Sequence, residues 1–358
     1  MLPVVWLLGA SGVGKSTVGY RMLSAAADAG VTAAFVDADQ LRLAAGVTAT
    51  ETGLIASALP ALSRGYRAHG AEVLVVAGQA DGPGHLARLL PGVPRDRVLA
   101  VHLDADADTI RERVRRRGWL VGLADEAAEH AARLDPGAAD VHVDTVGRSP
   151  ADIAAQVAAA ALGGPLRTTA DDDAPAPGAA PRRTAVVTGP GGAGLSTAGF
   201  GAFSRIARAG EAVGYLDAHQ LGFLGTRTRA DRLAPLRAAN TRVAAANLAR
   251  GGAGTVLVSG DPRTARLLRR LWDPGDVAVF WLHASPAVLA ERITRRARGD
   301  GPAIPGDHRA GLSGPALSAA VDAAVRESRL PRPSGARVID TDGLDAAQVA
   351  AAIAAALP

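Results

Sequence analysis

Cysteine is absent from this 358-residue chain, and aromatic residues make up only 3% of it. Without thiols there is no disulfide framework and no thiolate metal site. Sparse aromatic residues leave few rings on which nucleic-acid bases would stack, so a nucleic-acid partner is not expected. The eight histidines show no spacing typical of a zinc site. These absences turn attention to small-molecule chemistry.

Long apolar runs and a marked excess of charge are also missing. No stretch approaches the roughly 18 apolar residues of a membrane span, so no membrane partner is expected. Residues 1–10 are apolar but lack a basic leader and run directly into a glycine-rich loop. This favours a first strand over a signal peptide. The net charge is only +4, and we expect a cytoplasmic protein.

The chain has a single lysine, Lys15, and the other 38 of its 39 Lys and Arg residues are arginine. A single lysine in such a chain indicates a position where a compact ammonium is needed. It lies in Gly9–Ser16, which matches the phosphate-binding pattern G-x-x-x-x-G-K-[ST]. A buried strand over residues 3–8 and helical spacing after the loop agree with this motif. The alternative, a chance glycine-rich turn, is disfavoured because lysine is unique.

The motif predicts specific contacts with ATP and Mg²⁺. Its glycines let backbone N–H groups turn inward as an anion nest, and the following helix adds its positive end. Lys15 would reach the β- and γ-phosphates, Ser16 would offer a hydroxyl to Mg²⁺, and Thr17 would approach the α-phosphate. The expected phosphate-binding residues are Gly9, Ala10, Ser11, Gly12, Val13, Gly14, Lys15, Ser16 and Thr17.

The glycine-rich loop recurs 180 residues later as Gly189–Thr197, and four further landmarks recur in the same order. These pairs are Phe35–Leu41 and Tyr215–Leu221, Glu72–Gly78 and Thr255–Gly260, Glu112–Arg117 and Glu291–Arg296, and Val143–Thr145 and Ile339–Thr341. So long a period indicates duplication of a whole domain. We predict domains at 1–162 and 184–358, joined by a Pro- and Asp-rich linker at 163–183.

Each copy alternates short apolar runs with helical patterns, which predicts an α/β fold. We expect two tandem P-loop NTPase domains, each a five-stranded parallel sheet with helices on both faces. In the first copy, strands are expected near 3–8, 33–37, 72–77, 98–103 and 141–144, and helices near 15–29, 53–69, 106–117, 125–134 and 150–161. Ligands then bind at the carboxyl ends of the strands. The turn at residues 144–148, which follows the last strand, either contacts the adenine ring or simply connects the strand to the next helix.

The second copy differs where chemistry is expected. Leu195 replaces Lys15, and His219 replaces Asp39, although Ser196 and Asp217 are kept. Without the ammonium, negative charge on the phosphates lacks a partner. We interpret the second copy as catalytically silent. Weak nucleotide binding, a different ligand or a purely bracing role all stay open.

Two carboxylates, Asp37 and Asp39, end the second expected strand of the first copy. Alternate residues of a strand point to the same side, so both can face the ligand edge. The third strand ends in Gly78 and Gln79 without a carboxylate, so Asp37 is expected on the metal side. Asp39 would contact the substrate. The alternative is that Asp39 only caps the next helix.

Arginines supply the remaining candidates. Arg113, Arg116 and Arg117 share one helix face and are predicted to close as a lid over the transferring phosphate. The alternative is a solvated basic helix end. Further substrate-side candidates are Arg42, Arg64 and Arg67, although arginines usually lie on the surface for solvation alone.

Taken together, the loop, the Asp37–Asp39 pair, Gly78, the Arg113–Arg117 segment and Val143–Thr145 resemble the small P-loop kinases. That group includes shikimate, gluconate, adenylylsulfate and nucleoside monophosphate kinases. The resemblance spans residues 1–162 and, in degenerate form, 184–358.

This resemblance implies a strand order of 2-3-1-4-5 within each domain. It also implies that Asp37 lies near Mg²⁺, that Asp39 grips the accepting hydroxyl, and that the lid arginines come from residues 113–117. The glycine run of shikimate kinase is replaced here by Gly78–Asp81, which disfavours shikimate as the acceptor.

The leading hypothesis is ATP- and Mg²⁺-dependent phosphoryl transfer to a hydroxyl or phosphate of a small molecule by the N-terminal domain. The alternative is a regulatory or scaffold protein in which ATP sets the contact between the two halves. A nucleic-acid end kinase is a third reading, which the scarcity of aromatic residues disfavours. We expect the two halves to pack as an internal pseudo-dimer, with a homo-oligomer still open.

Overall fold

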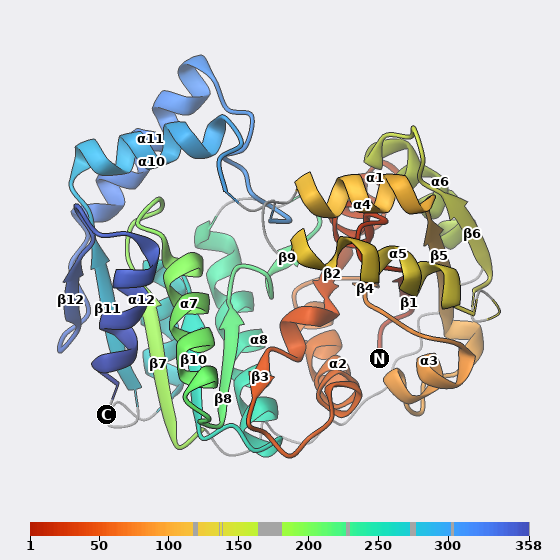
Figure 1. Cartoon of the computed structure of the whole chain (residues 1–358), viewed down its shortest axis with the longest axis horizontal. Helices are drawn as coiled ribbons and strands as arrows, with labels where there is room; N and C mark the ends of the chain where they lie inside the picture. Colours follow the sequence, from red (N-terminus) through yellow and green to blue (C-terminus); the bar gives the residue numbers. More distant parts are fainter. Residues whose placement is uncertain are drawn as a thin grey trace.

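The computed structural model describes residues 1–116, 121–135, 137, 139–163, 181–226, 230–272, 277–301 and 304–357. It has two α/β halves, called here the front half (1–163) and the rear half (181–357), which lie side by side (Figure 1). Most of the predicted linker, 163–183, lies outside the described residues.

The front half contains the elements that the sequence predicts and two short additions, β3 and α3. Its strands are β1 (Val4–Leu8), β2 (Ala33–Asp37), β3 (Ala44–Ala45), β4 (Val73–Ala77), β5 (Val98–Asp104) and β6 (Val141–Asp144). Its helices are α1 (Lys15–Asp28), α2 (Glu51–Ala68), α3 (Pro83–Leu89), α4 (Ala107–Arg116), α5 (Ala124–Arg133) and α6 (Pro150–Leu162). Short 3-10 turns lie at Ala38–Leu41, Arg95–Arg97 and Val121–Leu123.

The rear half repeats this order. Its strands are β7 (Arg183–Thr188), β8 (Val213–Asp217), β9 (Phe223–Leu224), β10 (Thr255–Ser259), β11 (Val277–His283) and β12 (Arg337–Asp340). Its helices are α7 (Leu195–Arg208), α8 (Ala230–Arg250), α9 (Pro262–Leu271), α10 (Pro286–Ala297), α11 (Gly314–Ser328) and α12 (Ala346–Ala355).

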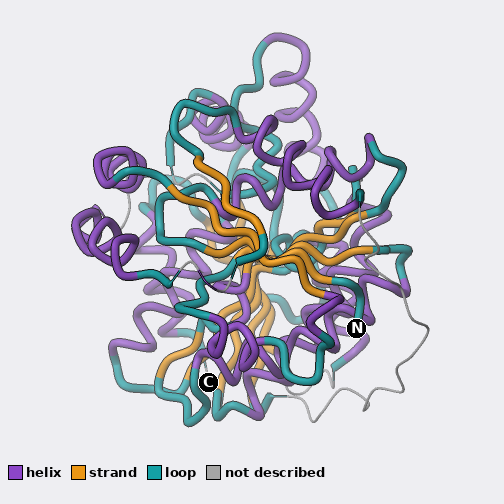
Figure 2. The backbone as a smooth tube through the Cα atoms, turned by 90° about the vertical axis from the view of Figure 1, so that its right-hand side faces the viewer, coloured by secondary structure: helices purple, strands orange, loops and turns teal. Residues whose placement is uncertain are grey.

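Each half is built on five parallel strands, as predicted. The front sheet runs β6-β5-β1-β4-β2 and the rear sheet β12-β11-β7-β10-β8, which is the expected order 2-3-1-4-5 in both. Every residue of β1, β4 and β10 is buried, because helices cover both faces of a parallel sheet. The strands lie inside and the helices outside in Figure 2.

A sixth strand in each sheet comes from the opposite half, which the sequence did not predict. The rear strand β9 pairs antiparallel with β2, and the front strand β3 pairs antiparallel with β8. Both pairs are visible in Figure 1. Each strand has only two residues, too few to show a period in sequence. The exchange covers one edge of each sheet and interlocks the halves.

Side chains extend this junction. The Phe223 ring, only 5% exposed, lies 6.0 Å from the Phe35 ring and 5.1 Å from the Tyr20 ring, between centroids, within the front core. Helices α2 and α8 pack together, where the Asn247 amide donates to the Leu54 carbonyl at 2.8 Å. The Ser57 hydroxyl donates to the same side chain at 2.7 Å. These contacts form the internal pseudo-dimer that the repeat suggested.

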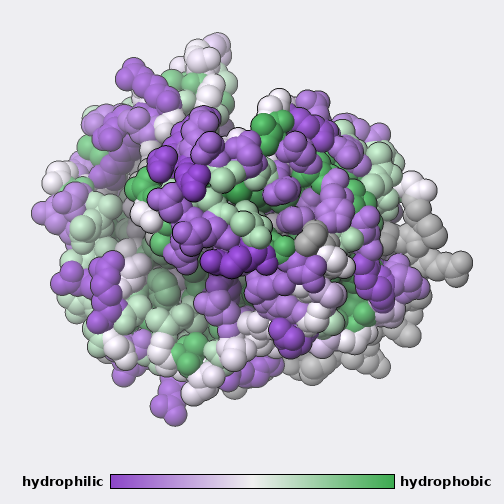
Figure 3. Space-filling model, turned by 45° about the vertical axis from the view of Figure 1, so that its right-hand side comes forward, coloured by the Kyte–Doolittle hydropathy of each residue, from purple (hydrophilic) through white to green (hydrophobic). Residues whose placement is uncertain are grey.

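Hydrophilic residues are spread over the face drawn in Figure 3, and the hydrophobic residues between them form no single large patch. Among the described residues, every helix is too short or too polar to cross a lipid bilayer.

Replacing the exchanged ring should uncouple the halves. Phe223→Ala removes a buried aromatic side chain, and we expect it to lower the free energy of unfolding by about 3–5 kcal/mol. Phe200→Ala is a matched control, because that ring is 41% exposed, and it should cost less than about 1 kcal/mol. Urea unfolding followed by circular dichroism measures both. Equal stability of the two variants would contradict the packing role of Phe223.

Candidate active site

The front phosphate loop connects β1 to α1 through backbone shapes that glycine alone adopts readily. Gly9 has φ +133°, and a Cβ there would lie 2.3 Å from the Leu103 carbonyl oxygen. Gly12 and Gly14 also have positive φ values, +96° and +100°. Gly14 is the N-cap of α1, so the positive end of this helix opens directly onto the loop. The predicted anion nest is therefore present as a backbone shape.

Lys15 folds back over this loop. Its ammonium donates to the carbonyl oxygens of Gly9 at 2.7 Å and Ala10 at 2.8 Å. The cation is thereby held at the mouth of the nest, within the same nine residues that the sequence identified. This posture places positive charge beside the donors that would face phosphate oxygens.

Ser16 and Asp37 meet beside the loop, although 21 residues separate them. The Ser16 hydroxyl donates to Asp37 Oδ2 at 2.5 Å, and the Asp39 backbone N–H donates to Asp37 Oδ1 at 3.0 Å. Burial, and then the negative charge of Asp39, raise the pKa of Asp37 to about 6. A hydroxyl and a carboxylate side by side are hard oxygen donors of the kind Mg²⁺ prefers. The donor set thus fits the predicted metal side.

Asp39 does not serve as the helix cap, because Asp37 accepts the capping hydrogen bond of the 3-10 turn. Its carboxylate is exposed and accepts from Arg42 Nε at 2.8 Å. Arg42 also pairs with Glu51 at the start of α2. The structure thus brings Asp39 and Arg42 together at the carboxyl end of β2, where substrate was expected.

A polar network that the sequence reasoning missed lies after β4. His85 Nδ1 lies 3.2 Å from the Asp81 carboxylate, and its Nε2 lies 3.0 Å from the Thr52 hydroxyl. Gln79 and His130 are in hydrogen-bond contact across from Asp81. These side chains come from the β4–α3 loop, α2, α3 and α5. Their meeting could not be read from spacing, since the residues are up to 78 apart in the chain.

A cavity of about 720 Å³ opens between α2 and α3 near this network. Its lining residues are Thr50, Thr52, Gly53, Ala87, Arg88 and Pro91. Thr52 therefore belongs both to the network and to the cavity wall. The polar side chains of the cavity wall come from both helices, Thr50 and Thr52 at the start of α2 and Arg88 in α3.

The lid arginines do not act as one group. Arg113 donates to the Thr145 hydroxyl and carbonyl, both at 2.8 Å, and reaches the Val13 carbonyl at 3.5 Å. It braces the phosphate loop against the turn after β6. Arg116 is exposed and pairs with Glu112, and Arg117 lies outside the described residues.

Arg64 and Arg67 are not brought to the site. Both lie in the last turns of α2, which runs antiparallel to the strands and ends just before β4 begins. That end lies at the amino edge of the sheet, where Ser63 accepts from the Leu2 N–H at 2.7 Å. The choice of Arg67 as a substrate residue overlooked the length of α2, which carries its C-terminal end away from the loop.

The rear half repeats the scaffold of this site. Gly189 and Gly192 have φ values of +154° and +92°, and the Ser196 hydroxyl donates to Asp217 Oδ2 at 2.6 Å. Burial, opposed by the Ser196 hydrogen bond, raises the pKa of Asp217. Arg292 donates to the Thr341 hydroxyl and carbonyl at 2.8 Å, as Arg113 does to Thr145. The frame of the site is therefore shared, and the difference lies in its charges.

The rear loop is occupied by the chain itself. The Glu327 carboxylate of α11 accepts from the Gly191 N–H at 2.8 Å. A Cβ on Gly191 would lie 2.1 Å from the Arg309 guanidinium, so this side chain also packs on the loop. Leu195 supplies no cation there. An internal carboxylate therefore uses a donor of the loop that an anion would otherwise use.

Residues 304–309 close over the rest of the rear site. The Gln220 amide donates to the Pro305 carbonyl at 3.1 Å, and a ring nitrogen of His219 lies 3.5 Å from the Gly306 carbonyl. His219 also packs edge-on against Phe223, with ring centroids 5.3 Å apart. His219, the counterpart of Asp39, is therefore half-buried and contacted by residues 304–309 in the rear half.

This burial predicts acid sensitivity. Burial, and then the charge of Arg237, lower the pKa of His219 from 6.5 to about 3. Between these values the unfolded chain binds more protons at this residue than the folded one, so the contribution of His219 to stability falls as the pH drops below 6.5, by about 1.4 kcal/mol per pH unit. The raised pKa of Asp37 acts in the opposite direction below about pH 6. Urea unfolding between pH 7 and 5 should therefore show that the His219→Gln chain gains stability relative to the wild-type chain as the pH falls.

The control is His142→Gln, which alters an exposed ring and should leave the pH dependence as in the wild type. A His219→Gln chain with the full wild-type slope would show that other groups cause the acid sensitivity.

No protein-family model and no curated protein matches this chain. Solved structures to which it is similar include a sugar kinase from Janibacter sp. HTCC2649, at 19% identity and a TM-score of 0.32, covering 46% of this chain and 95% of that one. A gluconokinase from Sinorhizobium meliloti 1021 has 24% identity and a TM-score of 0.29, covering 45% and 93%.

The adenylylsulfate (APS) kinase of Mycobacterium tuberculosis, in complex with AMPPNP and APS, has 22% identity and a TM-score of 0.32, covering 46% of this chain and 98% of that one. Each match thus spans less than half of this chain and nearly all of the other protein. These three solved proteins are therefore about half as long as this chain.

Proposed function

We propose that the front half transfers the γ-phosphoryl group of ATP to a hydroxyl or phosphate of a small molecule. The observation that carries this proposal is the convergence of Lys15, Ser16 and Asp37 at the mouth of one glycine-rich nest. A nest, a compact cation and two hard oxygen donors are the parts from which phosphoryl-transfer sites are assembled.

The chemistry follows from these positions. The loop amides and Lys15 would hold the β- and γ-phosphates, and Ser16 and Asp37 would hold Mg²⁺, which supplies positive charge to the phosphate oxygens when bound. An acceptor oxygen would form a bond to the γ-phosphorus while the bond to the bridging oxygen breaks, and ADP leaves with that electron pair. Asp39 would take the proton of an accepting hydroxyl.

Acceptor binding is assigned to the space between Asp39, Arg42 and the cavity beside Thr52. Asp39 and Arg42 pair at 2.8 Å, so an acceptor would exchange one of these contacts for its own. His85 and Asp81 would hold the far side of the acceptor through the Thr52 network. In this mechanism Arg113 holds the phosphate loop in place through its contacts with Val13 and Thr145.

We further propose that the rear half is catalytically silent. Three features support this: Leu195 replaces the lysine, Glu327 contacts the loop amide of Gly191, and residues 304–309 cover His219. The rear half would then serve to complete the front sheet through β9. A regulatory role for ATP is less favoured, because a reciprocal strand exchange ties the halves together through backbone hydrogen bonds.

The central test changes Lys15 and Leu195, which occupy the same position in the two phosphate loops. Lys15→Ala should lower turnover by about 1,000-fold, and Leu195→Ala should leave it unchanged, because only the front position carries charge. ADP release is measured with sugars, nucleosides, nucleotides and antibiotic-like alcohols as acceptors, and circular dichroism checks the fold. A Lys15→Ala chain with wild-type turnover would refute the mechanism. ATP binding without ADP release for any acceptor would favour the regulatory alternative.

A companion experiment addresses the rear half. In the Lys15→Ala background, Leu195→Lys should not restore ADP release, because Glu327 and residues 304–309 still cover the rear site and His219 replaces the expected carboxylate. Leu195→Lys with Glu327→Gln removes the competing carboxylate and should recover nucleotide binding, measured by calorimetry, without turnover. Turnover from either variant would overturn the proposed silence of this half.

A further inference from the structure

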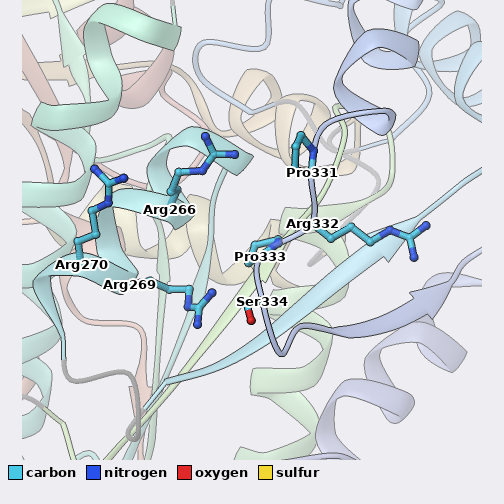
Figure 4. Close-up of a pocket in the computed structure, with 7 residues that line it drawn as sticks. All are labelled: Arg266, Arg269, Arg270, Pro331, Arg332, Pro333 and Ser334. Carbon is cyan, nitrogen blue, oxygen red and sulfur yellow. The ribbon is translucent and has the colours of Figure 1, made fainter.

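A second cationic pocket lies in the rear half, outside both phosphate loops. It encloses about 380 Å³ between α9 and the segment that leads into β12. Its lining residues are Arg266, Arg269, Arg270, Pro331, Arg332, Pro333 and Ser334 (Figure 4). The described lining contains four guanidinium groups and no carboxylate. A volume of this size accommodates a small ligand with several charged groups.

The pocket is at the opposite end of the sheet from the rear loop. Helix α9 begins after the carboxyl end of β10 and runs back to Leu271, shortly before β11 starts. Residues 331–334 precede the amino end of β12. Both walls therefore belong to the amino edge of the strands, whereas the phosphate loops lie at the carboxyl edge. A ligand here would not compete for space with a nucleotide.

The helical arginines concentrate like charge on one face. Arg266, Arg269 and Arg270 are spaced i, i+3 and i+4, so all three start from one side of the helix and line the same pocket. They form no ion pair with any residue that the structure describes, and the Nε atom of Arg269 is buried without a hydrogen-bond partner among those residues. The negative end of α9 offsets only part of the mutual repulsion. Among the residues that the structure describes, the cluster thus has no ion-pair partner.

The opposite wall is a short segment with two prolines and a serine. Pro331 and Pro333 restrict the backbone of the segment, and Ser334 adds a hydroxyl. In Figure 4 the side chains of Arg266 and Arg269 extend from α9 toward this segment, whereas Arg332 extends away from them. A guanidinium group binds phosphate oxygens through paired N–H donors. Several such groups along one helix can therefore bind several linked phosphate groups.

We propose that this pocket binds a small polyphosphate anion, independently of catalysis in the front half. The ligand class carries several negative charges on adjacent phosphate groups, because three arginines of α9 line one pocket and two of them, Arg266 and Arg269, extend toward the opposite wall. Aromatic side chains, on which a nucleobase or a nucleic-acid strand would stack, are absent from the lining. The phosphate chain itself is therefore the recognised part.

The test titrates inorganic tripolyphosphate into the full-length chain by calorimetry. Tripolyphosphate also fits the front loop, so each protein is measured with and without Lys15→Ala, which weakens that site. Arg266→Gln/Arg269→Gln/Arg270→Gln should reduce the affinity of the remaining site at least about tenfold. Arg205→Gln/Arg208→Gln is the matched control, because these exposed arginines occupy the last turn of α7 without lining the pocket.

The control variant should bind tripolyphosphate as the wild type does, and ADP release should be unchanged in both variants. If the triple variant does not fold, Arg266→Gln alone should still weaken binding about threefold or more. Unchanged affinity in the arginine variants, or an equal loss in the α7 control, would overturn the proposal and leave the cluster as a solvated helix end.

Discussion

A short hydrogen bond between a serine hydroxyl and an aspartate carboxylate joins the phosphate loop to the second strand in both halves. It connects Ser16 with Asp37 in front and Ser196 with Asp217 behind. This hydrogen bond fixes the first turn of α1 relative to the carboxyl end of β2. The positions of Lys15 and Asp39, and of the network of Asp81, His85 and Thr52 beside them, depend on this hydrogen bond.

The two halves show how one frame carries different chemistry. The glycine turns, the serine–aspartate joint and the arginine–threonine brace are repeated with nearly the same distances. What changes is the set of groups that would meet a ligand: an ammonium becomes an isobutyl group at position 195, and an exposed carboxylate becomes a half-buried imidazole at position 219. Glu327 accepts a hydrogen bond from a loop donor of the rear half. Frame and reactivity are therefore separable in this chain.

Much of the fold was predictable because its signals are local. The strands of the front half are continuous buried runs, and the loop motif places β1, the turn and α1 in one stretch of sequence. The strand order followed only from resemblance. The exchanged strands were missed because two residues carry no period, and Phe223 gives no sign in sequence that it enters the other core.

Sequence reasoning placed together residues that share a motif and misplaced residues whose position depends on the fold. Lys15, Ser16 and Asp37, proposed from their positions after strands, lie together in the structure. Arg67 lies at the far edge of the sheet, because α2 carries it there. His85 and His130 were passed over, since a hydrogen-bond network drawn from separate elements has no spacing rule. Arg113 was expected at the phosphate and instead spans the loop and Thr145.

Because β3 and β9 are exchanged between the halves, the two domains cannot be inherited separately. A duplicated domain normally keeps its independence, so that either copy can be deleted, shuffled or expressed by itself. Here each half adds a strand to the sheet of the other half. Separating the halves would leave backbone amide and carbonyl groups along the edge of β2 or β8 without hydrogen-bond partners. The replacement of Lys15 and Asp39 by Leu195 and His219 in the rear half therefore does not make that half dispensable.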